Sequence, residues 1–289
     1  MTQVGTWVAG ARPKTLGAAI SPVIVGTAAG SIDGPTIWWR ALAALIVALA
    51  LQVGVNYAND YSDGVRGTDR ERRGPVRLVA TGLATPRAVR NAALLSFAIG
   101  ALAGAVLALV VNPWLLLIGA AAIAAAVTYT GGPRPYGYLG LGEVMVLVFF
   151  GFVATLGTAY VQHQHLNVAA WCGALATGLP ACAVLLANNI RDVDTDRVAG
   201  KRTLAVRLGT ARARTLYGAC LVGSLVAVAV CAVFYPAALI ALVAAPLALR
   251  PVRLVRTRSD PPSLVAALVG TVRFQLVLAV LLAAGLWAS

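Results

Sequence analysis

The sequence predicts an all-α, polytopic membrane protein that crosses the bilayer nine times. Hydrophobic residues make up 60% of the 289 positions, charged residues make up only 11%, and the mean hydropathy is +0.82. A soluble domain carries about 25% charged residues, so this chain has too few charges to cover a globule of its size. These values exclude a soluble enzyme, a secreted domain and a disordered chain.

Nine apolar runs are candidates for the membrane spans, because about 20 apolar residues cross the hydrocarbon core as a helix. The first and the eighth run are short and need apolar help from their flanks. Pro113 and Pro236 each open a span, where the missing N–H of proline costs nothing. The nine runs are Leu16–Gly30, Ile37–Ala58, Ala88–Val111, Pro113–Thr130, Leu141–Val161, Val168–Ile190, Ala213–Phe234, Pro236–Leu249 and Leu264–Ala288.

The basic residues define the expected orientation. With a cytoplasmic N-terminus, the inner loops are 59–87, 131–140, 191–212 and 250–263. These loops, their flanks and the N-terminal segment hold all of the 23 Lys and Arg residues except Arg40 and Arg273. Such an excess is typical of cytoplasmic loops, so the net charge of +13 reflects topology, and no nucleic-acid partner is expected. We expect a multi-pass protein of the inner (plasma) membrane, with the N-terminus and the functional site inside and the C-terminus outside.

A short internal repeat indicates two related halves. Asn59 to Asp63 ends the second span, Asn188 to Asp192 ends the sixth, and both segments read Asn-x-x-x-Asp after an alanine. The two motifs therefore occupy equivalent positions four helices apart. We expect one transmembrane domain over residues 1–289, with pseudo-repeat halves of four helices at about 12–140 and 141–263 and a ninth helix at 264–288.

Six of the ten acidic residues fall in two short segments. These residues are Asp60, Asp63, Asp69, Asp192, Asp194 and Asp196. On a helix, Asn56, Asn59, Asp60 and Asp63 share one face, and Asn188, Asp192 and Asp196 share another. Acids at a helix C-terminus oppose the helix dipole, and acids at membrane depth are costly and usually functional. A bound cation should therefore compensate them, and oxygen ligands from Asp and Asn select Mg²⁺ before Ca²⁺.

Basic residues alternate with these acids. Five arginines from Arg66 to Arg77 follow the first cluster, Arg191, Arg197, Lys201 and Arg202 surround the second, and Arg12 and Lys14 precede the first span. Each of these residues by itself fits the positive-inside pattern. Acids that can hold a metal beside basic residues that can hold anions have the composition of a metal–diphosphate site.

The two acidic motifs resemble those of a known family. Asn59-Asp60-Tyr61-Ser62-Asp63 with Asp69, and Asp192-x-x-x-Asp196 with Lys201, resemble the motifs of UbiA-type intramembrane prenyltransferases, and the resemblance covers nearly the whole chain. The similarity is greatest to the branch that prenylates 1,4-dihydroxy-2-naphthoate. Three stretches carry it, namely Ala11–Leu16, Asn59–Asp69 with Gly74-Pro75-Val76-Arg77, and Tyr129–Glu143. The spacing from Asp63 to Asp69, wider than in the broad superfamily, is typical of that branch.

The resemblance implies a UbiA-like bundle and a Mg²⁺-dependent transferase. Its substrates would be a polyprenyl diphosphate and 1,4-dihydroxy-2-naphthoate, and the prenylation with loss of CO₂ would lead to demethylmenaquinone, in menaquinone biosynthesis. Two Mg²⁺ ions would bridge the diphosphate, and the polyprenyl tail would reach the lipid bilayer sideways. The implied catalytic residues are Asp60, Asp63, Asp69, Asp192, Asp196 and Lys201, of which the five aspartates would hold the metal.

Other residues are expected to bind the substrates. Basic side chains could clamp diphosphate oxygens, the loop Tyr129–Glu143 has glycines that allow close approach to a flat ring, and Arg134 could meet the acceptor carboxylate. The expected substrate-binding residues are Arg12, Lys14, Asn56, Asn59, Arg66, Arg77, Tyr129, Arg134, Tyr136, Tyr138, Asn188, Asn189 and Arg202.

Two other interpretations stay open at this point. Another prenyl acceptor, such as 4-hydroxybenzoate, or a phosphoribosyl donor reaction would keep the same metal site. An ion-coupled transporter would also hold acids at helix breaks, but it would place them near mid-membrane, facing two exits. All six aspartates follow the second and sixth spans on one side, which favours the enzyme.

Overall fold

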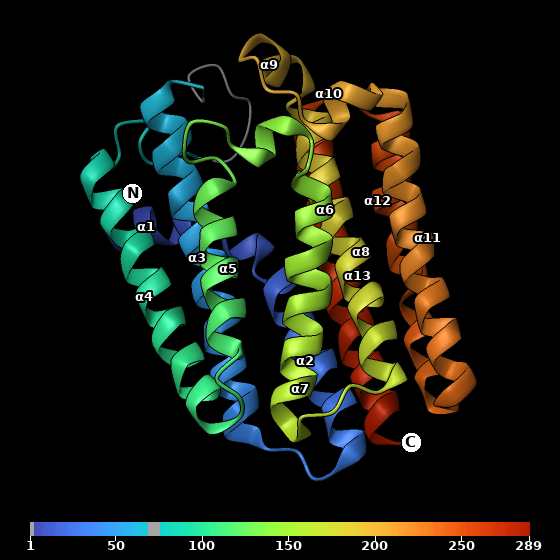
Figure 1. Ribbon diagram of the computed structural model, residues 1–289. Helices are drawn as coiled ribbons and strands as arrows, with labels where there is room; N and C mark the ends of the chain where they lie inside the picture. Colours follow the sequence, from blue (N-terminus) through green and yellow to red (C-terminus); the bar gives the residue numbers. More distant parts are fainter. Residues whose placement is uncertain (1–2, 69–75) are drawn as a thin grey trace.

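The computed structural model describes residues 3–68 and 76–289, and within these ranges the chain forms helices and connecting turns but no strand (Figure 1). The segment η4 is π-helical and joins α6 to α7, and the other η segments are 3-10 helices. The elements are α1 (Gln3–Ala11), η1 (Pro13–Thr15), α2 (Gly17–Gly30), η2 (Ser31–Asp33), α3 (Trp38–Arg66), α4 (Pro86–Val110), α5 (Leu115–Thr128), η3 (Tyr136–Leu139), α6 (Gly142–Val146), η4 (Leu147–Val153), α7 (Ala154–His163), α8 (Val168–Arg191), α9 (Val193–Val198), α10 (Leu204–Leu208), α11 (Thr210–Phe234), η5 (Pro236–Ala244), α12 (Pro246–Thr257) and α13 (Pro261–Trp287).

Six of these helices are long and apolar enough to cross a membrane, which confirms the prediction of an all-α, multi-span protein. They are α3, α4, the continuous stretch Gly142–His163, α8, α11 and α13. Two bent pairs raise the number to eight, namely Val4–Thr15 with Gly17–Asp33, bent by 53°, and Pro236–Ala244 with Pro246–Thr257, bent by 43°. The remaining apolar helix, α5, is shorter, because it spans only 14 residues.

Two helices extend beyond their expected ends. The second expected span stops at Ala58, but α3 continues to Arg66 and ends at Gly67, whose φ of 74° lies in the left-handed region that suits a helix C-cap. Asn59 and Asp63 therefore stand on a regular helix. The eighth expected span breaks at Ala245, and its second part, α12, continues to Thr257 through most of an expected loop.

Helix α8 is the centre of the bundle. It contacts α2, η4, α11 and α13, and most of its length is buried. Small residues allow these close approaches, as they do between many membrane helices. A Cβ placed on Gly178 of α8 would lie only 2.6 Å from the Cα of Gly151 in η4. Figure 1 shows α8 and α13 between the α6–α7 column and the α11–α12 pair.

Residues 76–85 and the chain segments that follow α5, α8 and α9 gather at one end of the bundle. In Figure 1 this is the upper end, with α9 and α10, while the C-terminus lies at the opposite end. Three of the expected cytoplasmic loops therefore meet in space. This end carries the two acidic motifs, since Asp63 lies near the end of α3 and Asp192 follows α8.

Candidate active site

A cavity of about 380 Å³ lies between α2, α3, α5, η4, α7 and α8. Its size falls within the range of about 300–1,000 Å³ that is usual for small-molecule sites. The end near the gathered loops is lined by acidic, basic, amide and tyrosine side chains, and the opposite part is lined by aliphatic and phenylalanine side chains. The cavity therefore offers a polar chamber that continues into an apolar one.

Three polar residues of α3 line the polar chamber from one helix face. Asn56, Asn59 and Asp63 recur at helical spacing, and each of them borders the cavity. The amide of Asn56 donates to the carbonyl oxygen of Ala11 at 3.0 Å, and the hydroxyl of Thr130 donates to Oδ1 of Asn59 at 2.7 Å. These two bonds fix the helix face against the N-terminal segment and the loop after α5.

Asp63 is the meeting point of the two motifs. The Tyr138 hydroxyl donates to its Oδ1 at 2.6 Å, and Nζ of Lys201 lies 3.4 Å from the same oxygen. The guanidinium of Arg77 lies 3.6 Å from Oδ2. Lys201 also lies 4.0 Å from Oδ1 of Asp196. One ammonium group thus joins a carboxylate of the first motif to a carboxylate of the second.

The second motif lines the facing wall. Asn188, Asp192 and Asp196 all border the cavity. Arg191 donates from Nε and from a terminal nitrogen to the two oxygens of Asp192, each at 2.7 Å, and so holds this carboxylate in one orientation. Asp194 of α9 lies between Asp192 and Asp196 in the sequence. Its side chain is 92% exposed and points away from the site.

Asp60 does not line the cavity, in contrast to its predicted role as a metal ligand. Its two oxygens accept hydrogen bonds from the backbone N–H groups of Leu78 at 2.8 Å and Val79 at 3.1 Å. Asp60 and Asp63 are three positions apart and so diverge by about 60° around the helix, which turns Asp60 towards the returning chain. By holding Leu78, it positions the adjacent Arg77 next to Asp63.

Replacing Asp60 by alanine is expected to destabilise the fold by about 3 kcal/mol, because two N–H groups at a buried segment lose their acceptor. Thermal unfolding of the purified variant in detergent would show this as a clearly lower Tm. Asp194→Ala removes an equally charged but exposed side chain and serves as the control. An unchanged Tm for the Asp60 variant would contradict the role in holding the 77–79 segment.

Several further predicted residues do border the cavity. Arg12 precedes η1 with a φ of 55°, in the left-handed region, and lines the site together with Arg77 and Lys201. Tyr129, Tyr136 and Tyr138 form part of the wall from the loop after α5. Asn189 also borders the cavity, and its amide donates to Oε1 of the buried Glu143 at 2.8 Å.

Four predicted residues lie elsewhere. Arg66 donates to the carbonyl oxygens of Thr130 and Gly132, and its guanidinium covers the Tyr138 ring at 5.6 Å. It therefore braces the loop that carries Tyr138 rather than reaching the cavity. The remaining three do not border the cavity and are exposed, namely Lys14, Arg134 and Arg202. Asp69, the third expected ligand of the first motif, lies outside the described residues.

The tyrosines of the wall are neutral hydrogen-bond donors near neutral pH. Burial raises the pKa of Tyr136 to about 12. Burial, and then the nearby carboxylate of Asp63, also raise the pKa of Tyr138 above its ordinary value. The Tyr138 hydroxyl therefore keeps the proton that it donates to Asp63.

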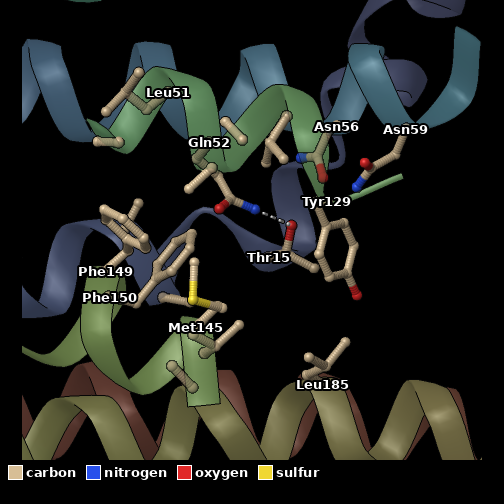
Figure 2. Close-up of a pocket in the computed structure, with 18 of the residues that line it drawn as sticks. Thr15, Leu51, Gln52, Asn56, Asn59, Tyr129, Met145, Phe149, Phe150 and Leu185 are labelled. Atoms are coloured by element: carbon tan, nitrogen blue, oxygen red, sulfur yellow. Dashed lines mark hydrogen bonds between the residues drawn. The ribbon is translucent and has the colours of Figure 1, made fainter. Parts of the chain in front are cut away.

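Some polar residues of the cavity have no counterpart in the sequence prediction. Gln52 lies one turn before Asn56 on the same helix face, and its amide donates to the Thr15 hydroxyl at 3.4 Å across the cavity (Figure 2). Its helical spacing from Asn56 could have revealed it. Thr130 and Thr203 also border the cavity, but only the path of their loops brings them there.

The apolar chamber is formed where the π-helical segment meets α3 and α8. Figure 2 shows Phe149, Phe150 and Met145 opposite Leu51 and Gln52, with Leu185 of α8 below. A π-helical insertion re-aims side chains within a helix and is frequent at functional sites. Here it turns two consecutive phenylalanines into the cavity.

The donor set fits magnesium shared with a phosphate ligand. The cavity-facing oxygen donors come from Asp63, Asp192 and Asp196 and from the amides of Asn59 and Asn188. Within the described ranges, however, no group of three acidic, histidine or cysteine side chains lies close enough together to hold a metal alone. Mg²⁺ is usually held by one or two carboxylates plus substrate phosphates. The cavity offers such a set as two half-sites on facing walls, Asp63 from the first motif and Asp192 with Asp196 from the second.

Comparisons with known proteins point to one family. The model of the UbiA prenyltransferase family matches residues 19–277. A 1,4-dihydroxy-2-naphthoate octaprenyltransferase from Mycobacterium tuberculosis is 52% identical over 286 residues, which cover 99% of this chain and 98% of the relative. The protein of the same name from Escherichia coli is 39% identical, with coverage of 100% and 97%.

Solved structures support the fold. A UbiA homolog from Archaeoglobus fulgidus, bound to GPP and Mg²⁺, aligns with a TM-score of 0.67 at 14% identity, over 96% of this chain and 99% of that chain. The apo UbiA homolog from Aeropyrum pernix aligns with a TM-score of 0.67 at 18% identity, over 93% and 96%. At these identities the likeness concerns the arrangement of the helices.

Proposed function

This chain belongs to the UbiA prenyltransferase family, and from that premise we propose that it transfers a polyprenyl group from polyprenyl diphosphate to 1,4-dihydroxy-2-naphthoate. The reaction forms a carbon–carbon bond at the ring carbon that bears the carboxylate and releases diphosphate and CO₂. The observation that carries the proposal is the full-length identity of 52% to an enzyme of that name. The two-chambered cavity, polar at one end and apolar at the other, supplies the matching chemistry.

The polar chamber receives the diphosphate. Arg12, Arg77 and Lys201 border it, and their charged donors suit phosphate oxygens. Asp63, Asp192 and Asp196 would hold Mg²⁺ between the two half-sites, with two ions as the expected number. When bound, the metal supplies positive charge that neutralises the leaving diphosphate. Tyr138 and Arg191 keep two of these carboxylates in place through the hydrogen bonds described above.

The apolar chamber holds the prenyl chain and excludes water. An allylic carbocation develops as the C–O bond breaks, and water would quench it. Phe149 and Phe150 line the cavity next to Met145, and aromatic faces attract positive charge. The same wall therefore keeps the reacting carbon dry and favours the charge that develops on it.

The acceptor ring is placed at the wall formed by the loop after α5. Tyr129, Gly137 and Tyr138 border the cavity there. The neutral Tyr129 hydroxyl can donate to a ring oxygen, while the hydroxyl proton of Tyr138 is already donated to Asp63. Arg134 is exposed and outside the cavity lining, so the proposal does not include its predicted contact with the acceptor carboxylate. Loss of CO₂ restores the aromatic ring, so the step requires no strong base from the protein.

The mass of the product tests the acceptor. With 1,4-dihydroxy-2-naphthoate and farnesyl diphosphate, the product should weigh acceptor plus prenyl minus CO₂, and CO₂ release should match diphosphate release one for one. 4-Hydroxybenzoate, which reacts at a carbon that bears hydrogen, serves as the comparison. A product that keeps its carboxylate, or a preference for 4-hydroxybenzoate, would overturn the acceptor while leaving the diphosphate site in place.

The proposal includes nine spans with the site at the cytoplasmic end. The six long helices and the two bent pairs account for up to eight crossings, and in this proposal the shorter apolar helix α5 would be the ninth. The halves 12–140 and 141–263 would each contribute one acidic motif to the shared cavity. The loops gathered there carry most of the basic residues, as cytoplasmic loops do.

Cysteine labelling tests the orientation. A cysteine at the exposed Arg134 should react with an impermeant reagent only from the cytoplasmic side, and one at the exposed Gln164 only from the outer side. All four native cysteines are buried, so the unmodified chain is the background control. Labelling of both positions from the same face would overturn the nine-span arrangement.

A further inference from the structure

Arg273 occupies an unusual position in the bundle. It lies midway along α13 (Pro261–Trp287), a membrane-spanning helix, and its side chain is exposed. An arginine on the lipid-facing side of a span is costly unless it meets an anion or reaches the interface. In the described ranges 3–68 and 76–289, no hydrogen bond or ion pair engages its side chain.

The packing of α13 defines which groove Arg273 faces. A Cβ on Gly17 of α2 would touch Val272, and a Cβ on Gly270 would touch Pro251 of α12. Viewed down the axis of α13, with 3.6 residues per turn, the Arg273 side chain points about 100° away from Val272 and about 60° away from Gly270. Its direction lies between those of these two residues. Arg273 therefore faces outward between α2 and α12, on the side nearer to α12.

A second arginine stands at the same height on α12. The contact between Gly270 and Pro251 sets the two helices in register, and α12 runs antiparallel to α13. Arg250 is therefore level with Thr271, two residues before Arg273. Like Arg273, Arg250 is exposed, and its side chain engages no partner among the described residues. On the other flank, Lys14 of η1 is exposed close to α13, because η1 contacts that helix.

The depth of these charges matches a lipid headgroup. Trp287 packs against Trp38 with ring centroids 6.1 Å apart and marks one membrane interface, which is the outer one in the orientation proposed above. Arg273 lies about 21 Å from Trp287 along the helix, roughly 9 Å short of the far edge of a 30 Å hydrocarbon core. An arginine can bridge much of that difference by extending its guanidinium to the interface. Exposed Leu247 and Val280 continue the groove with apolar surface towards the bilayer centre.

We propose that the groove between α12 and α13 binds an anionic phospholipid of the inner leaflet, with Arg250 and Arg273 on its phosphate and Lys14 as a third charge beside it. The acyl chains lie along the apolar continuation of the groove. A second copy of this chain is a poorer occupant, because a two-fold interface on α13 would place the same exposed arginine on both partners. The site is separate from the diphosphate chamber, since neither arginine borders that cavity.

The test is lipid binding by the purified full-length chain, measured by native mass spectrometry. Phosphatidylglycerol is titrated against wild type and against the double variant Arg250→Gln with Arg273→Gln. The double variant should bind about thirtyfold more weakly, since each basic residue near a lipid surface contributes roughly a fivefold factor. Arg87→Gln with Arg90→Gln, which removes two exposed charges at the start of α4, should bind like wild type.

Further arms separate the possible occupants. Phosphatidylcholine with the same acyl chains should bind more weakly than phosphatidylglycerol, and inorganic phosphate should compete poorly. Equal binding of the two lipids, equally tight binding of free phosphate, or a dimer that is lost in the double variant would each overturn the proposal. If the glutamine variant folds poorly, crosslinking of a photoactivatable phosphatidylglycerol to the wild-type chain tests the site without any variant. The lipid should crosslink to peptides of α12 and α13, and crosslinks confined to other helices would contradict the site.

Discussion

Replacing Asp63 by asparagine is expected to lower kcat/KM about a thousandfold, because removal of one preorganised electrostatic group from an active site costs up to that factor. The amide keeps an oxygen that can accept the Tyr138 hydroxyl, now 2.6 Å from Oδ1, so the loop should stay in place. What is lost is the negative charge that faces Lys201 and Arg77 and that would hold magnesium. Steady-state assays with polyprenyl diphosphate measure the effect.

The matched control is Asp194→Asn. Asp194 lies between Asp192 and Asp196 in the sequence, but its side chain is 92% exposed and does not border the cavity. This variant should keep its activity, and both variants should keep the Tm of wild type. Near-normal turnover by the Asp63 variant would refute its place at the metal–diphosphate site, whereas equal losses in both variants would indicate a general effect of charge.

Lys201→Gln is expected to reduce kcat/KM for polyprenyl diphosphate about a hundredfold. A hydrogen bond to a charged group is worth about 1.5–3 kcal/mol, and tenfold corresponds to about 1.4 kcal/mol. Lys201 is buried and lies within 4.0 Å of both Asp63 and Asp196. Its loss removes a charge that would meet the diphosphate and also the group that joins the two motifs.

Two comparisons make the Lys201 experiment specific. Lys201→Arg retains the charge and should recover part of the activity, while Arg197→Gln, an exposed charge on α9, should have little effect. The KM for the aromatic acceptor should change less than the KM for the diphosphate substrate. If the acceptor KM changed most, Lys201 would belong to the acceptor pocket instead.

Helix faces within one continuous helix could be predicted from the sequence. Asn56, Asn59 and Asp63 share a face of α3 and all border the cavity, as their spacing predicts. The same spacing argument placed Asp60 with them, and this is where it fails. Asp60 and Asp63 differ in direction by about 60° around α3, so Asp63 faces the cavity while Asp60 accepts hydrogen bonds from residues 78 and 79. Only the path of the returning loop decides which aspartate binds that segment and which lines the cavity.

Basic residues in loops and at a helix end show the same limit. Arg66, Arg134 and Arg202 stand beside motif residues in the sequence, yet their side chains lie outside the cavity lining. Loop paths depend on long-range contacts, such as the backbone hydrogen bond from Arg202 to the carbonyl oxygen of Tyr138 at 2.9 Å. That bond orients the chain so that the neighbouring Lys201 turns inward while the Arg202 side chain stays exposed.

The sequence by itself determined the membrane class, the helical architecture, the side that carries the basic loops and the acidic motifs that resemble a prenyltransferase. These properties follow from composition and from local periodicity, since a bilayer imposes the same length and polarity on every span. The tertiary structure alone decided that Lys201 joins Asp63 to Asp196 and that a π-helical turn directs Phe149 and Phe150 into the chamber. It also placed Arg250 and Arg273 at nearly the same height on two packed helices, α12 and α13. Such pairings join residues far apart in the chain, and they form only when packed helices fix their relative height and rotation.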